Sequence, residues 1–488
     1  MEMAGVDPRD ARIAELEAQV AGRDAALARR DSRIAELERK VEELTRLVKV
    51  FEERLRRFSG NSDKPPSSDS PKAREERHGK GEKGSRKRGG QPGHPGSTRE
   101  LLPAEQVDDF VHLFPPQCES CLASLPEAPD PFAQRFQTTE LPPIKPHTTE
   151  YLRHGVVCQC CGHKTWAPLN QIPSSPFGPR LSSIVGLVTG IYHLSRRAAV
   201  SLLSDLVGLD ISLGAVSAIE ARVSEAVKAP VAEAWDEVQR DTVKHTDGTT
   251  WYQAGVLHSL WTIATTVATV FKILADGTAE SLRPLFGGGL GILVSDRAKA
   301  LKFWAMEMRQ ICWAHLLRKF VSFSECTGRA GAIGRELLDY LAILFTYWDS
   351  FKNGELSRQE LQERMAPVRL QVESSLERAA LAQLPSVSGS CADILEHRAA
   401  LWTFLDCKGV EPTNNHAERE LRAFVLWRKR SFGTQSARGN LFAERLMTVA
   451  HTARKQKKNV LDFLTTCCTA AHDGLAPPSL FAPCLPMS

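Results

Sequence analysis

Apolar residues recur every seven positions along the first part of the chain. The first seam runs from Ile13 to Leu55 without a break, and a second seam includes Leu16, Leu37 and Phe51. A repeat of 3.5 residues keeps one face of a helix turned toward a partner helix, which is the pattern of a coiled coil. We predict a coiled coil over residues 1–60 that pairs subunits into a homo-oligomer. The alternative is a lone amphipathic helix packed on its own protein.

Length and composition indicate a multidomain protein of the cytoplasm. At 488 residues the chain is too long for one compact core, and about three domains are expected. The sequence has no export signal at its start and no run of about 18 apolar residues, so we expect no secretion and no membrane contact. Because thiols stay reduced in the cytoplasm, clustered cysteines are better candidates for metal binding than for disulfides.

Positive charge is concentrated in two stretches, although the net charge is only +4. Ten Lys or Arg face four acids between Lys64 and Arg99, and eleven face two between Arg419 and Lys458. Such stretches favour contact with nucleic acid, although each alone could equally be a solvated surface. The first belongs to a segment rich in Pro, Gly and Ser, residues 61–100, which we interpret as a flexible linker or DNA-binding arm. The candidate phosphate contacts in this arm are Arg86, Lys87 and Arg88.

Two Cys-x-x-Cys pairs, separated by 36 residues, predict a zinc-binding module over residues 101–175. Each pair can place two thiolates on one Zn²⁺ ion, and two pairs complete a closed tetrahedral site of the structural kind. Cys160 and, less favourably, His163 are competing ligands, and alternation from Phe136 to Tyr151 predicts strands as in a small zinc ribbon. The four predicted ligands are Cys118, Cys121, Cys158 and Cys161.

Residues 176–240 have the period of helices. Two interpretations fit equally: a helix-turn-helix that reads DNA, or a helical collar packed on the next domain. Ser212 is a good N-cap for the last of the three predicted helices. These helices are Leu181–His193, Arg197–Leu206 and Leu213–Val227.

From residue 241 onward the pattern changes to strands. Three short runs of β-branched and aromatic residues precede a helix and one more apolar strand, which is the opening of a ribonuclease-H-like α/β fold. We predict this catalytic domain over residues 241–464, with a helical insertion at about 313–400 and a C-terminal tail at 465–488. The five predicted elements are Thr242–Tyr252, His258–Ala264, Val267–Leu274, the helix Thr278–Phe286, and Gly291–Ser295.

Three acids stand where such a fold would hold metal ions. Asp247 lies within the first strand, Asp296 ends the last apolar strand, and Glu418 lies near the start of a predicted helix. A carboxylate among buried residues is costly unless it is paired or binds a metal. Each acid alone is more simply a solvated or capping residue, but the three in this order indicate one metal site. Glu420 lies about 200° around the helix from Glu418 and should face away from this site.

Three motifs carry a resemblance to a known family. They are Gly89-Gly-Gln-Pro-Gly-His-Pro-Gly96, Cys312-Trp-Ala-His315, and Asn414-Asn-His-Ala-Glu-Arg419 with Arg428-Lys429. With these motifs the chain resembles the insertion-sequence-66 family of DDE transposases from its linker to about Leu464. The resemblance implies that Asp247, Asp296 and Glu418 form the catalytic triad and that the four cysteines form the family's zinc module. In the family a glutamate usually follows the first aspartate, whereas Gly248 stands here.

The expected activity is metal-dependent cleavage and strand transfer of an insertion element at its terminal inverted repeats. Two Mg²⁺ (or Mn²⁺) held by three carboxylates can activate the nucleophile and stabilise the leaving oxygen of an in-line displacement at phosphorus. Basic residues after Glu418 are expected to neutralise nearby phosphates. They are Arg419, Arg422, Arg428, Lys429 and Arg430.

The expected partners are the element's terminal repeats, target DNA and a second copy of the chain, in association with the bacterial nucleoid. The resemblance also implies accessory transposition proteins. Two other functions fit the same residues: a catalytically inactive, zinc-containing DNA-binding regulator, and a nuclease that only hydrolyses DNA.

Overall fold

The computed structural model describes residues 20, 22–24, 27–42, 100–169, 172–173 and 175–482. The chain divides into two compact units, which are described separately: one holds residues 1–81 and 312–398, the other residues 82–311 and 399–488. The predicted arm with Arg86, Lys87 and Arg88, and much of the predicted coiled coil, lie outside the described residues.

A five-stranded sheet forms the centre of the second unit, in the order β5-β4-β3-β6-β7. β3, β4 and β5 are antiparallel neighbours, whereas β6 and β7 continue the sheet in parallel with β3. The four predicted strands are confirmed to within two residues at each end. β7 was not predicted, because three residues are too few to display a period. The strands are β3 Val243–Gln253, β4 Val256–Ala264, β5 Thr269–Leu274, β6 Ile292–Ser295 and β7 Arg309–Ile311.

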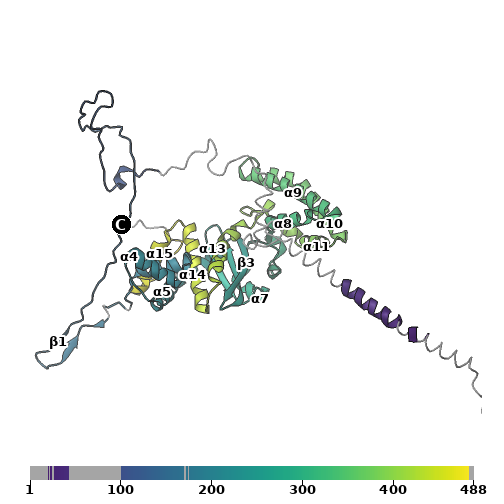
Figure 1. Ribbon diagram of the computed structural model, residues 1–488, viewed down its shortest axis with the longest axis horizontal. Coiled ribbons are helices and arrows are strands. Elements are labelled where there is room, and N and C mark those ends of the chain that lie inside the picture. The colour runs from purple at the N-terminus through teal and green to yellow at the C-terminus, as the bar shows by residue number, and fades with distance from the viewer. Residues whose placement is uncertain are drawn as a thin grey trace, which may run out of the picture. The chain divides into compact units, whose positions relative to one another are not determined.

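Each face of the sheet packs against helices. On one face Trp251 of β3 contacts Phe424 and Trp427 of α13 (Asn415–Ser431), with ring centroids 5.4 and 5.9 Å apart. The other face carries Trp261, with residues of α5 and α6 in the same buried cluster. Figure 1 shows α13 beside β3 and the helices α4, α5, α14 and α15 gathered next to them. The alternation of β3 therefore separates a face covered by α13 from a face covered by earlier helices.

The helices before the sheet pack on helices that follow it. α5 contacts α3, α14 and α15, and its residues Val216, Ile219 and Val223 are fully buried. α5 keeps an exposed face that includes Gly214, Ala218 and Arg222, so the helical collar and the helix-turn-helix both stay predictions. The short helix predicted before β6 forms as α7 Ala279–Leu282 and a 3₁₀ turn, Arg283–Phe286. The other helices are α3 Pro179–Gly186, extended by a π-helical turn Leu187–Ile191, α4 Arg196–Val207, α5 Leu213–Ala226, α6 Lys228–Arg240, α12 Thr403–Asp406, α14 Ala437–Lys455 and α15 Val460–Asp473.

α14 runs along β5, the strand at one edge of the sheet. Three side chains spaced by one helical turn, Glu444, Thr448 and Thr452, accept hydrogen bonds from alternate N–H groups of β5 at 2.8, 3.2 and 3.1 Å. Four helical residues rise about 6 Å and two strand residues about 6.8 Å, so the two repeats match over this length. The side chains of α14 thereby take the place of a sixth strand.

The segment 100–169 contains little regular structure. Its strands are β1 Gly155–Val157 and β2 Lys164–Trp166, an antiparallel pair. The strands predicted between Phe136 and Tyr151 are wrong, since none of these described residues is in a strand. The prolines in this stretch cannot donate ladder hydrogen bonds, which outweighs the alternating pattern.

In the first unit, residues 313–395 form the helices that the sequence predicts there, and their interpretation as an insertion stays a prediction. Its helices pack in sequence, α8 on α9, α9 on α10 and α10 on α11. A capping box of Ser357 and Glu360 starts α10. Residues 27–42 are also helical, with the predicted seam residues Leu27 and Ile34 51% and 50% exposed. The bounds are α8 Trp313–Ser324, α9 Gly328–Lys352, α10 Arg358–Leu381 and α11 Ser388–Leu395.

None of the helices in the described part of the chain combines the length and apolarity needed to cross a membrane.

Candidate active site

Asp247 lies within β3, and Asp296 directly follows β6, the parallel strand beside β3. β3 and β6 pair with His245 opposite Val294. Continued for two more residues, this register places Asp247 opposite Asp296. Side chains alternate between the two faces of a strand, so both aspartates then share the face of His245. Both aspartates are half-buried. Since Trp251 shares this face of β3 and contacts α13, the two acids lie on the side of the sheet that α13 covers.

Asn414 fastens the start of α13 to β3. It is fully buried, and its side-chain amide donates to the Thr246 carbonyl at 2.7 Å. Its Oδ1 lies 3.3 Å from Nδ1 of His245. The Glu418 amide donates to the Asn414 carbonyl at 3.2 Å, so the first turn of α13 is held beside the residues that precede Asp247. The elements that carry the three predicted catalytic acids thus meet at one end of one sheet face.

Arg309 supports the segment that carries Asp296, a role that sequence reasoning missed. This β7 residue is fully buried, and its Nη2 donates to Ser295 Oγ and to the Asp296 carbonyl, each at 3.0 Å. Burial lowers the pKa of Arg309 to about 10, although the charge of Asp296 acts in the opposite direction. Its Nε and Nη1 have no hydrogen-bond partner among the described residues. The sequence offers no signal for this role, because Arg309 stands between the polar residues Glu307 and Gln310 and its strand has only three residues.

Gly248, which departs from the family motif, has a local reason. A Cβ at this position would lie 2.8–2.9 Å from ring atoms of Trp261 on the next strand. No side chain fits there unless Trp261 moves. The Gly248 amide also donates to Asp247 Oδ1 at 2.9 Å, and the Ala298 amide donates to Asp296 Oδ1 at 2.9 Å.

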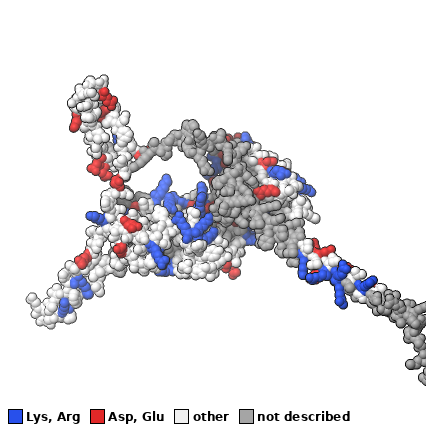
Figure 2. Space-filling view, in the orientation of Figure 1, with Lys and Arg blue, Asp and Glu red and all other residues white. Residues whose placement is uncertain are grey.

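The basic residues of α13 fall into two groups. Arg419, Arg422, Lys429 and Arg430 are exposed. Arg428 is different: it is half-buried, and it donates to Thr249 Oγ1 at 3.0 Å and to the carbonyl and hydroxyl of Thr250. Arg428 therefore holds the last turn of α13 on β3 and is not counted among the candidate phosphate contacts. In Figure 2, Lys and Arg side chains gather in the region where Figure 1 draws the C-terminal helices.

Glu420 lies about 200° around α13 from Glu418, but its side chain does not point to solvent. Its carboxylate accepts a hydrogen bond from Nδ1 of His451 and lies 3.3 Å from Nζ of Lys455 and 3.5 Å from Nε2 of His416. Burial alone would raise the pKa of Glu420, but hydrogen bonds from His416 and His451 and the charge of Lys455 bring it well below its ordinary value. This buried cluster joins α13 to α14. The expectation that Glu420 faces away from the candidate site stays a prediction, and the cluster gives this residue a structural role that the sequence did not indicate.

Replacing Glu420 by glutamine is expected to lower the free energy of unfolding by about 1–3 kcal/mol, because charged hydrogen-bonding partners then lose a buried counter-charge. Chemical denaturation of the purified protein measures this. Glu411→Gln is the matched control, since Glu411 is exposed in the segment before α13. Equal stability of both variants would mean that the cluster gives α13 no net stabilisation.

His193 packs on the other end of α13. Its ring stacks on Trp427 with centroids 4.6 Å apart, and its Nε2 is buried with no hydrogen-bond partner among the described residues. Burial, assisted by the charges of Arg430 and His451, lowers the pKa of His193 from 6.5 to about 4. The imidazole is therefore neutral in the folded protein at neutral pH.

We expect this histidine to make the fold sensitive to acid. As pH falls below 6.5 the unfolded chain takes up a proton that the folded chain accepts only near pH 4, so stability is lost across that window. Since the ring is partly exposed, we expect about 1–2 kcal/mol. Unfolding free energies at pH 7 and pH 4.5 should differ less in His193→Gln than in the wild type. An identical difference in both proteins would assign the acid sensitivity to other groups.

The predicted zinc ligands form two similar knuckles. The Cys118 amide donates to the Ala123 carbonyl and the Leu122 amide to the Cys118 carbonyl, both at 2.9 Å; Cys158 makes the corresponding pair of bonds with His163 and Gly162. Hydrogen bonds from the backbone amides of Cys121 and Ser120 lower the pKa of Cys118, and those of Cys161 and Cys160 lower the pKa of Cys158. Within the described residues the structure does not gather three or more of these thiols at one point. Each knuckle is formed on its own.

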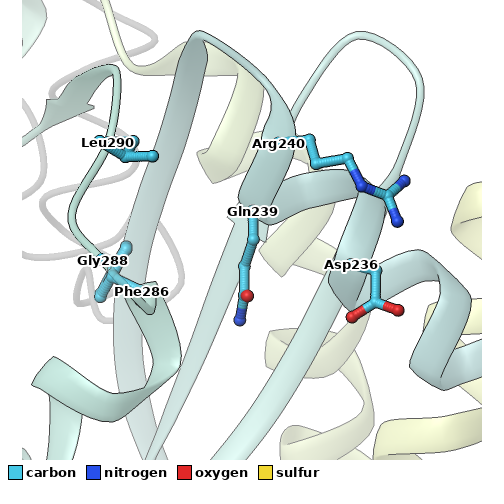
Figure 3. A pocket seen from close by; sticks show the side chains of 6 residues that line it. All are labelled: Asp236, Gln239, Arg240, Phe286, Gly288 and Leu290. Carbon is cyan, nitrogen blue, oxygen red and sulfur yellow. The ribbon is translucent and has the colours of Figure 1, made fainter.

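A hollow beside the sheet lies at the opposite end of β6 from Asp296. Figure 3 shows residues from the end of α6 and from the glycine-rich segment before β6 around it. Ligands of sheets with parallel strands bind at the carboxyl ends of those strands, so this hollow is not the candidate site. Its lining residues are Asp236, Gln239, Arg240, Phe286, Gly288 and Leu290.

Comparison with known proteins assigns the central part of the chain to a family. The model of the family described as "Transposase IS66 family" matches residues 177–441, more than half of the chain, and this range includes Asp247, Asp296 and Glu418. A second family, of unknown function (DUF6444), matches residues 6–100. No curated protein matches the chain. This protein belongs to the IS66 family of transposases.

Proposed function

We propose that this protein is a DDE transposase that cuts DNA at the terminal repeats of an insertion element and joins the ends to target DNA. The observation that carries the proposal is the parallel pairing of β3 and β6, whose register ends at His245 opposite Val294, two residues before Asp247 and Asp296, with the start of α13 held beside β3 by Asn414. The strand order, three antiparallel strands followed by two parallel ones, supports a ribonuclease-H-like catalytic domain.

The three acids suit hard cations. Carboxylate oxygens from neighbouring strand ends and from the first turn of a helix are the donors that Mg²⁺ and Mn²⁺ prefer. Asp247, Asp296 and Glu418 are the residues that would hold such ions. When bound, the ions would activate water or a 3′-hydroxyl and stabilise the leaving oxygen.

The protein's own residues would prepare this site. Arg309 fixes the backbone at Asp296 from beneath and places a buried positive charge near it. Asn414 holds the first turn of α13, and with it Glu418, at a fixed position relative to β3. The exposed cations Arg419, Arg422, Lys429 and Arg430 would contact DNA phosphates.

The remaining segments would bind DNA and a second subunit. The arm with Arg86, Lys87 and Arg88 would contact phosphates, and the N-terminal heptads would pair subunits. Two preformed Cys-x-x-Cys knuckles, each with one thiol of lowered pKa, support binding of Zn²⁺ by Cys118, Cys121, Cys158 and Cys161. Such a site would be structural, because four thiolates leave no open position.

An assay with labelled element ends, a target plasmid and Mg²⁺ tests the proposal. Cleavage followed by joining to the plasmid is the expected result. Cleavage without joining would identify a hydrolytic nuclease instead, and binding without cleavage would identify a catalytically inactive regulator.

A further inference from the structure

Phe432, the residue that ends α13, has an unusual backbone and an unusual exposure. Its φ is 57°, in the left-handed region, and its side chain is 78% exposed. Glycine normally occupies this position after a helix, because a side chain there meets the backbone. A strained residue that also exposes a large aromatic ring gains nothing in folding that glycine would not supply. Such positions are enriched at binding sites.

The backbone around Phe432 is held in place. The Phe432 amide donates to the Arg428 carbonyl at 2.8 Å, and Thr434 exchanges hydrogen bonds with Tyr252 and Ala254 at 2.9 and 2.8 Å. The intervening Gly433 is required, since a Cβ there would lie 2.0 Å from the Tyr252 carbonyl oxygen. The turn is thus attached to the end of the β3–β4 hairpin, and the ring of Phe432 projects from a fixed base.

A cationic stripe leads from Glu418 to Phe432 along α13. Between Glu418 and Ser431 five positions of the helix are exposed, and their spacing places them on one solvent face. Four of them are basic and one is apolar, Leu426, which is 50% exposed. These positions are Arg419, Arg422, Leu426, Lys429 and Arg430. A row of cations that ends at an exposed aromatic ring matches nucleic acid, whose phosphates bind cations and whose bases stack on aromatic rings.

The length of the stripe predicts how far along the DNA strand Phe432 lies from the three acids. Phe432 is fourteen positions after Glu418. At 1.5 Å per residue this is about 21 Å, or roughly six nucleotides at 3.4 Å each along one strand.

We propose that Phe432 stacks on a base of the element end, about six nucleotides from the phosphate at Asp247, Asp296 and Glu418. Cations of α13 would hold the backbone between the two points. This inference rests on the proposed function, because it takes the three acids to mark the phosphate that is cut. It adds a contact with a base, which none of those acids provides.

Fluorescence of 2-aminopurine, placed at successive positions near the cut in a labelled element end, tests the proposal with the full-length protein. The wild type should change the signal most at roughly the sixth nucleotide. Phe432→Trp should keep this change and Phe432→Ala should lose it. Affinity of Phe432→Ala should fall roughly 5- to 150-fold, the equivalent of one lost stacking contact of ~1–3 kcal/mol.

Matched variants separate stacking from other effects. Leu290→Ala removes an exposed apolar side chain at the opposite end of β6 from Asp296, away from α13, and should bind like the wild type. Lys429→Ala should reduce the log–log dependence of affinity on salt by roughly one, whereas Phe432→Ala should leave that slope unchanged. Phe432→Gly should unfold at a higher denaturant concentration than the wild type while binding DNA more weakly, because it relieves the backbone but removes the ring.

The failures are distinguishable. If the wild type binds and cuts element ends but Phe432→Ala does so equally well, the inference is overturned and the proposed function stands. The same holds if no single position responds, or if Phe432→Ala disrupts binding of a protein instead of DNA. If the wild type does not bind element ends, the proposed function itself fails.

Discussion

Strand transfer should be lost when Asp247 or Asp296 is replaced by asparagine, or Glu418 by glutamine, with rates at least roughly 10³-fold below the wild type. Each substitution removes a charged oxygen donor from a site in which ions must be placed relative to one another. The losses should therefore be non-additive, with a double variant little worse than a single one. Cleavage and joining of labelled element ends measure both effects.

Binding and stability provide the controls for this result. DNA binding should persist in all three variants, because the candidate phosphate contacts are separate side chains such as Arg422 and Lys429. Stability in the absence of metal should not fall in Asp247→Asn or Glu418→Gln, since removing one carboxylate relieves repulsion among like charges. Asp296→Asn also removes the charge that faces buried Arg309, so its stability has to be measured separately. Glu411→Gln should leave the activity unchanged, whereas Glu420→Gln is unsuitable as a control because Glu420 is built into a buried cluster. Full activity in any of the three acid variants would remove that residue from the proposed site.

The second large effect is expected at Glu444, where alanine should lower the free energy of unfolding by about 3–5 kcal/mol. Glu444 is buried, and it accepts hydrogen bonds from the Ile273 amide at 2.8 Å and from Lys272 Nζ at 2.9 Å. Burial raises the pKa of this carboxyl, and Lys272 acts against that rise. Removing the side chain leaves the Lys272 ammonium group and the Ile273 amide without this acceptor, and each lost hydrogen bond adds to the loss of stability.

Graded substitutions separate these contributions. Glu444→Gln retains an acceptor for the Ile273 amide and should lose only about 1–2 kcal/mol. Arg454→Ala, on the exposed side of the same helix, should change stability by less than about 0.5 kcal/mol. Denaturant unfolding measures these changes in the free energy of unfolding. Hydrogen exchange at the β5 amides should be faster in Glu444→Ala than in the wild type. Protection of those amides equal to the wild type would mean that α14 does not secure the edge.

The sequence predicted those parts of the fold whose pattern is local. β3, β4 and β5 were readable because each has six or more residues and is rich in β-branched or aromatic side chains. Asp247 and Asp296 were proposed because one lies within a predicted strand and the other directly ends an apolar strand, and their catalytic role stays a prediction. The helices of residues 313–395 were equally visible from their period.

What could not be predicted depends on contacts between distant residues. The hydrogen bond from Asn414 to Thr246 spans 168 residues, and no local pattern connects them. Arg428 has the same composition signal as its exposed neighbours, yet its direction on the helix turns it onto β3. The surroundings of Glu420 could not be predicted for a related reason: helix geometry places it about 200° from Glu418, but only the position of α14 shows that its carboxylate is buried there.

The attachment of α14 to β5 has a consequence for synthesis of the chain. Ile273 and its acceptor Glu444 are 171 residues apart. At ~5–20 residues per second, a ribosome needs roughly 10–30 s to make the helix after the strand. Throughout that interval the nascent domain has an open edge that can pair with strands of neighbouring nascent chains on the same messenger. Transcripts that end before residue 444 should therefore yield aggregates rather than an inactive soluble fragment, and chaperone demand should be greatest while this stretch is being translated.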